Sequence, residues 1–186
     1  MLRTLSSIGV GSMVLALVGC THVVPVAYSP LDAPARVQVK SSKRVKVEPF
    51  SDDRLTAMLM IAGETRWVVP SDVTEVITDA IKTELANTGY QIVAEGEDFI
   101  LSGSVLIVAM FREPGVVTSY GEGGVRIRVK LKDVKEGKTV CPGMISGRSS
   151  MVGGAFGPSA EEVVNLAIKD LIYNLVTSEW LHAALK

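Results

Sequence analysis

Histidine and cysteine, the residues that most often bind transition metals, are scarce in this chain. It contains two of each in 186 residues. His22 and His182 lie near opposite ends, so the sequence shows no cluster of metal ligands. The Gly-x-Ser-x-Gly motif, in which many hydrolases present a nucleophilic serine, is also missing. We therefore expect a protein that is not an enzyme and that has no metal or other dissociable cofactor.

An excess of charge of either sign is missing as well. The chain has 19 lysines and arginines against 20 aspartates and glutamates. Residues 1–19 contain one basic residue and no acid, so the remainder has 18 basic against 20 acidic side chains. Binding to nucleic acid requires a clear cationic excess or stripe. We expect no nucleic acid as a partner.

Two glycine clusters resemble phosphate-binding loops in composition only. Residues 121–124 are Gly-Glu-Gly-Gly, and residues 153–157 are Gly-Gly-Ala-Phe-Gly. Neither cluster has the lysine followed by serine or threonine of a P-loop, and neither has the spacing of a dinucleotide-binding turn. We interpret both clusters as flexible loops.

The first twenty residues have the organisation of an export signal. A basic start at Arg3 precedes an apolar segment over residues 8–18, which is short for a bilayer-spanning helix. Residues 17–20 are Leu-Val-Gly-Cys, which resembles the lipobox of bacterial lipoproteins. That resemblance implies cleavage before Cys20 and covalent attachment of lipid to it. Because two or three acyl chains give stable anchoring, the expected membrane anchor is the lipid on Cys20.

The residue after the lipobox bears on location. In lipoproteins of enteric-type bacteria, an aspartate directly after the lipidated cysteine resembles a signal for retention in the inner membrane. This chain has Thr21 at that position. The resemblance therefore implies the periplasmic face of the outer membrane.

With Cys20 lipidated, Cys141 has no partner for an internal disulfide. We interpret Cys141 as a small buried residue, and an intermolecular disulfide or a reactive thiol is the alternative.

Three parts follow from this organisation. Residues 1–19 are the expected signal peptide, and residues 43–186 the expected periplasmic α+β domain. Residues 20–42 contain the lipidated cysteine and three prolines, which favour extended, weakly packed backbone. We interpret residues 20–42 as a tether that lets the domain sit away from the membrane and reach a partner.

Hydrophobic periodicity predicts the fold class. We expect an α+β domain with a mostly antiparallel sheet of four to five strands and two helices packed on one face. The first strand is expected within residues 37–40 and 44–47, and the other four are expected over residues 90–93, 99–111, 125–132 and 139–151. The first helix, capped by Ser71, ends at Gly89. The second begins with a capping box of Ser159 and Glu162, and a short third helix follows Ser178.

One predicted strand carries a regular row of cations. Four basic residues alternate with apolar ones: Arg126, Arg128, Lys130 and Lys132. A period of two places all four on one face of the sheet, while the helices cover the other. The first interpretation is a solvated face, balanced by acids on neighbouring strands. The alternative is a candidate binding face for an acidic protein or an anionic envelope polymer.

An apolar, methionine-rich stretch covers residues 55–62. Its candidate contact residues, together with a nearby tryptophan, are Met58, Leu59, Met60, Ile61 and Trp67. We favour a buried strand or helix of the core. If the stretch is exposed, it suits contact with a protein or a membrane.

From about residue 71 to the C-terminus, the order and spacing of elements are similar to the YajG family of bacterial outer-membrane lipoproteins. Residues 88–93 are Thr-Gly-Tyr-Gln-Ile-Val, like the Gly-Tyr exit of that family into a strand. Residues 152–159 are similar to its Val-x-Gly-Ala-Phe-x-x-Ser, and we expect Phe156 within them to pack against the sheet. The resemblance implies a small α+β periplasmic domain and supplies no catalytic residues.

Together these observations predict a membrane-anchored periplasmic lipoprotein that acts as a non-catalytic binding, scaffold or assembly module of the cell envelope. An envelope enzyme acting on cell-wall material and a purely structural outer-membrane component are the alternatives. The expected partners are the membrane, through the lipid, and either another envelope protein or further copies of this chain.

Overall fold

The computed structural model describes residues 21–32, 39, 41–56, 58–59, 66–113, 118–154 and 157–185. Cys20, Met60, Ile61 and Phe156 lie outside these residues, so the expectations that concern them stay predictions.

Twelve elements are described in all, and they are named here in chain order. They are β1 (Thr21–Val23), β2 (Arg44–Val47), β3 (Ser51–Asp52), β4 (Met58–Leu59), β5 (Arg66–Val68), α1 (Val73–Thr88), β6 (Gln91–Ile92), β7 (Phe99–Glu113), β8 (Ser119–Asp133), β9 (Thr139–Gly153), α2 (Ala160–Val176) and α3 (Glu179–Ala184).

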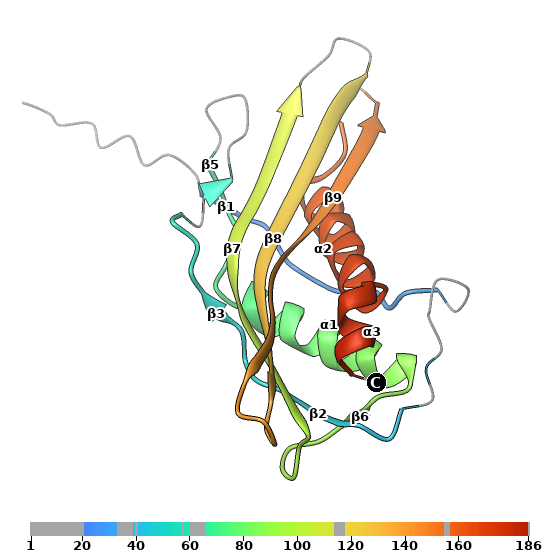
Figure 1. Ribbon diagram of the computed structural model, residues 1–186. Helices are drawn as coiled ribbons and strands as arrows, with labels where there is room; N and C mark the ends of the chain where they lie inside the picture. The colour runs from blue at the N-terminus through green and yellow to red at the C-terminus, as the bar shows by residue number, and fades with distance from the viewer. Residues whose placement is uncertain are drawn as a thin grey trace, which may run out of the picture.

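A six-stranded sheet forms the main layer of the described fold. Its order is β6-β2-β7-β8-β9, and β3 pairs with β7 beside β2. The strands β7, β8 and β9 are 15 residues long and pair antiparallel, whereas the short β2, β3 and β6 join in parallel. Helices α1 and α2 pack on the same face of the long strands (Figure 1). The predicted α+β fold is confirmed, and the structure adds the parallel edge.

The core lies between the sheet and the two long helices. Alternate residues of β8 point into it, with Ile127, Val129 and Leu131 fully buried. From the helices, Ile81 of α1 and Leu171 of α2 are fully buried too. Each such side chain contributes about 1.5–3 kcal/mol relative to exposure. This burial leaves the opposite face of β8 in solvent.

Helix boundaries follow local signals, with one exception. The capping box is confirmed: Ser159 Oγ accepts a hydrogen bond from Glu162 N at 3.1 Å, and Glu162 Oε2 accepts one from Ser159 N at 3.0 Å. Ser159 N and Ser159 Oγ both donate to the Glu162 carboxylate, and these two hydrogen bonds lower the pKa of Glu162. Gly89 ends α1 with φ 110°, a conformation that favours glycine. The prediction of Ser71 as cap was wrong, because the N-cap of α1 is Asp72, one residue later, and its side chain makes no capping hydrogen bond.

The glycines of residues 121–124 belong to β8, so their interpretation as a loop was wrong. Two of them, Gly121 and Gly123, are needed because α2 begins close to the sheet. A Cβ on Gly121 would lie 2.8 Å from Pro158 Cγ, and one on Gly123 would lie 2.8 Å from the carbonyl oxygen of Val163. Glycine therefore permits close packing of helix on sheet rather than flexibility.

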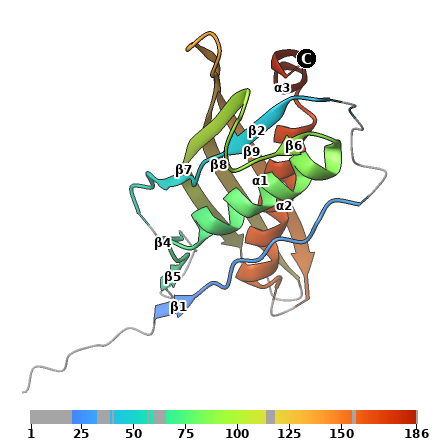
Figure 2. The same cartoon turned by 90° about the horizontal axis from the view of Figure 1, so that it is seen from below.

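Residues 24–32, the N-terminal strap, run along the outside of the helices (Figure 2). Val24 is fully buried and Leu31 nearly so. Ala27 N donates a hydrogen bond to Asn165 Oδ1 of α2 at 3.0 Å. The backbone is extended, as the prolines predict, but the expectation of weak packing was wrong for these residues.

A fully buried glutamate of α1 holds the strap. Glu84 Oε1 accepts hydrogen bonds from Tyr28 Oη at 2.9 Å and from Leu31 N at 3.0 Å. Replacing Glu84 by alanine removes this buried acceptor from both donors. We expect the free energy of unfolding to fall by about 2–3 kcal/mol.

Urea denaturation measures this loss. Tyr28→Phe is the matched variant, because it removes only one of the two bonds, and we expect it to cost about 1 kcal/mol. Equal stability of Glu84→Ala and the parent protein would contradict the role assigned to Glu84.

Candidate functional site: the cationic sheet face

Four basic side chains form a row on the face of the sheet that the helices leave uncovered. Arg126, Arg128, Lys130 and Lys132 are all exposed, and the residues between them are buried. We call them the cation row. Successive members are two residues apart on one strand, so their Cα atoms are separated by about 7 Å.

The strands on either side of the row present no opposite charge to it. On β7 the facing residues are Ile107, Ser104, Ser102 and Ile100. On β9 they are Ser146, Met144, Pro142 and Thr139. The balancing acids expected on neighbouring strands are therefore absent from the described facing positions.

Few polar contacts restrain the row. Arg126 Nε donates a hydrogen bond to Ser146 Oγ at 3.2 Å. Among the described residues, none of the four cations forms an ion pair within 4.0 Å. One acid, Asp53, lines a cavity of about 160 Å³ together with Arg128 and Lys130. The charges of the row therefore remain largely available to a ligand.

A shallow depression continues the cation row toward the β7–β8 hairpin. Ala109 and Gly124 face each other there, and a Cβ on Gly124 would meet nothing within 4 Å. The cavity over them is about 590 Å³ and is also lined by Phe111, Glu122 and Arg148. Phe111 is about half exposed. We call this depression the hollow. It places apolar surface next to the cation row.

Sequence reasoning missed Arg148 and the hollow. Arg148 is exposed on β9 and pairs with Gly124 of β8, so it adds a fifth cation to this face. Its alternation with Ser146 and Ser150 is a weak signal of an outward position. Only the register between β8 and β9 shows that Arg148 stands beside the hollow.

The apolar stretch contributes to a second, smaller sheet. Strand β5 pairs in parallel with β1 and antiparallel with β4, which contains Met58 and Leu59. We call β1, β5 and β4 the small sheet. Trp67 is half-buried against the core, and His22 of β1 stacks on it with ring centroids 5.0 Å apart. Leu55 is fully exposed, so the interpretation of a buried stretch was wrong for that residue.

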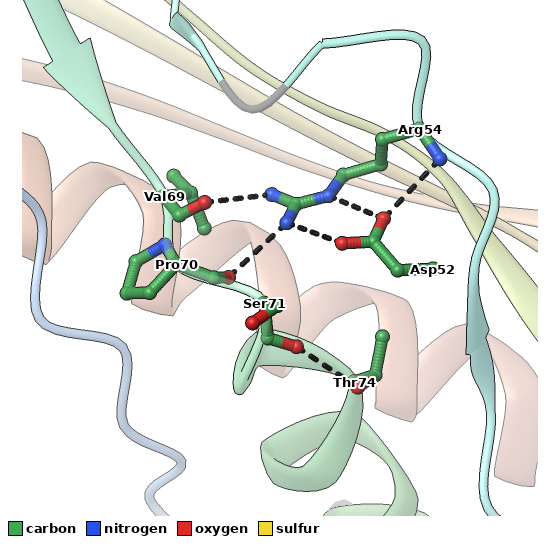
Figure 3. Close-up of polar contacts among 6 residues, drawn as sticks. All are labelled: Asp52, Arg54, Val69, Pro70, Ser71 and Thr74. Atoms are coloured by element: carbon green, nitrogen blue, oxygen red, sulfur yellow. Dashed lines mark hydrogen bonds and ion pairs between the residues drawn. The ribbon is translucent and has the colours of Figure 1, made fainter.

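A buried arginine fixes the chain just before Leu55 (Figure 3). The Arg54 side chain, 3% exposed, donates to both carboxylate oxygens of Asp52 at 2.8 and 2.7 Å. It also donates to the carbonyl oxygens of Val69 and Pro70, both at 3.1 Å. The hydrogen bonds from Arg54 lower the pKa of Asp52. This clasp ties the segment after β3 to the junction between β5 and α1.

The described part of the chain shows no group of three or more histidine, cysteine, aspartate or glutamate residues arranged to hold a metal ion. None of its helices is long and apolar enough to cross a membrane.

Comparison with known proteins identifies the fold. No family model and no curated protein matches the sequence. Protein XCC0632 from Xanthomonas campestris, of family DUF330, is similar in structure, with TM-score 0.51, 15% identity, and coverage of 89% of this chain and 95% of that one. The hypothetical protein CT253 from Chlamydia trachomatis has TM-score 0.52 and 11% identity, over 74% and 94% of the two chains.

A lipoprotein is also among the similar structures. Lipoprotein GNA1162 from Neisseria meningitidis has TM-score 0.43 and 13% identity, with coverage of 73% of this chain and 99% of that one. The fold is that of small bacterial proteins. At these identities the likeness establishes the fold alone.

Proposed function

We propose that this chain is a lipid-anchored protein of the bacterial cell envelope that binds an acidic partner protein without catalysis. The observation that carries the proposal is the cation row, which faces only uncharged residues on both adjoining strands. Lipid on Cys20, at the periplasmic face of the outer membrane, is supported by Leu-Val-Gly-Cys followed by Thr21. The similarity to the YajG family supports the same location.

The electrostatics of the row favour an anion. Two like charges about 7 Å apart in water repel by about 0.6 kcal/mol before screening by salt. Each inner member of the row has two such neighbours and no acid facing it across the strands. A bound carboxylate row relieves this repulsion, whereas a neutral ligand does not.

The hollow favours a protein over a plain polymer. Phe111 and Ile107 are partly exposed on the same face, beside Arg126 and Arg148. Aromatic and arginine side chains next to one another are typical of the centre of protein interfaces. A partner segment that carries both carboxylates and an apolar side chain therefore fits this face best.

Charge reversal tests the proposal. Arg128→Glu with Lys130→Glu leaves the fold nearly intact, because exposed charges contribute little to stability. We expect the double variant to bind immobilised poly-glutamate at least tenfold more weakly at low salt, with the difference shrinking as salt rises. Retention on the immobilised peptide at a series of salt concentrations measures both effects.

A control with the same change in net charge separates the row from bulk electrostatics. Lys82→Glu with Lys169→Glu places the reversal on the helices, away from the outer sheet face. This control is expected to keep most of the binding. Equal binding by the two double variants would contradict a specific role for the row, and turnover of cell-wall fragments by the parent protein would favour the enzyme alternative.

A further inference from the structure

The chain is already paired in a sheet where a tether was expected. Strand β1 starts at Thr21, the residue that follows Cys20. Consecutive Cα atoms are about 3.8 Å apart, so an acyl group on Cys20 is attached one residue away from the small sheet. The strap then continues along the helices instead of away from them.

Covalent geometry limits how far the small sheet lies from the lipid. His22 is two residues from Cys20, which places its Cα within about 7.6 Å of the cysteine Cα. Trp67 is the register partner of His22 on the adjacent parallel strand, about 4.8 Å further. The backbone of Trp67 therefore lies within about 12 Å of the lipidated residue.

From this we infer that the small sheet lies against the bilayer surface, with Trp67 at the level of the lipid headgroups. The inference rests on the proposed lipid on Cys20. The side chains present at this surface suit it: Val23 is 63% exposed, and His22 and Trp67 form an amphipathic ring pair. Tryptophan prefers the interface between water and lipid.

As a consequence, the domain can reach only a short distance from the membrane. A free segment over residues 21–42 would have an r.m.s. length of about 25 Å and a maximum of about 75 Å. With the strap packed, almost none of this length separates the domain from the lipid. The cation row therefore meets partners within about the width of the domain, roughly 40 Å, from the membrane.

Two tryptophans give matched reporters of this arrangement. Trp67 lies in β5, and Trp180 lies in α3, which is on the opposite side of the fold from the small sheet in both views (Figures 1 and 2). Trp180→Phe leaves Trp67 as the only tryptophan, and Trp67→Phe leaves Trp180, so excitation at the red edge of the absorption band reports on one site at a time. The full chain is produced in bacteria, purified in detergent, checked for acylation by mass spectrometry, and reconstituted into phosphatidylethanolamine–phosphatidylglycerol vesicles. Nitroxide on added lipid headgroups serves as the short-range quencher.

We expect quenching of Trp67 to be at least twofold stronger than that of Trp180. Insertion of a flexible 20-residue Gly-Ser segment between Cys20 and Thr21 keeps the lipid and the fold, and is expected to lower the quenching of Trp67 to the level of Trp180. The inference would be overturned if both tryptophans of the lipidated, vesicle-bound protein were quenched alike, with and without the insertion. Absence of lipid on Cys20 would instead overturn the proposed anchor, and the inference with it.

Discussion

Replacing Gly147 by alanine is expected to lower the free energy of unfolding by about 3 kcal/mol or more, a large share of the total stability of a domain of this size. Gly147 lies in β9 where α2 crosses the sheet. An added Cβ would overlap the carbonyl oxygen of Ala167 and the backbone nitrogen of Leu171, and would lie 2.6 Å from Leu171 Cα. These atoms belong to the helix backbone, so rotation of a side chain cannot relieve the overlap. The helix must move away from the sheet and give up buried contacts.

Gly143→Ala is the matched control, because Gly143 occupies the same strand four residues earlier. A Cβ there would meet nothing within 4 Å. We expect its free energy of unfolding to stay within about 0.5 kcal/mol of the parent. Urea denaturation of both variants provides the measurement. Equal stability of the two alanine variants would show that α2 does not pack as closely on β9 as described.

The second large effect is expected at the anchor. Cys20→Ala should move the protein from the membrane fraction to the soluble periplasm, or leave it with an uncleaved signal. Each buried methylene contributes about 0.8 kcal/mol, so two or three acyl chains hold a protein on the membrane almost irreversibly, and the variant has none. Fractionation of cells and mass spectrometry of the N-terminus measure location and processing.

Cys141→Ala controls for the loss of a cysteine as such. Cys141 lies in β9, outside the export signal, and its replacement is expected to leave membrane retention unchanged. If Cys20→Ala is processed normally and retained on the membrane like the parent, the lipid is not the anchor.

Much of the fold was predictable because its signals are local. Alternation in β8 and the helical spacing in α2 each depend on a few consecutive residues, and both elements were predicted. The capping box of Ser159 and Glu162 is equally local. The first cap was placed wrongly because Ser71 and Asp72 are both good cap residues, and only the backbone conformation distinguishes them.

Features that depend on distant pairs were not predictable. Periodicity could not show that Glu84 holds a strap more than fifty residues earlier in the chain. Glycines signalled loops in the sequence, whereas Gly123 and Gly147 are required by the close approach of α2. Leu55 is apolar yet fully exposed, because the adjacent Arg54 is buried in a clasp with carbonyl groups of another segment.

By itself, the sequence determined the long strands and the helices, the α+β class and the single face on which four cations gather. These follow from periods of 2.0 and 3.6 residues, which covalent geometry imposes on any strand or helix. The tertiary structure alone decided what lies opposite each cation, that Arg148 joins them, and that the expected tether is packed from its first residues. Register, strap docking and helix-to-sheet distance are set by contacts between residues far apart in the chain, and no local pattern encodes them.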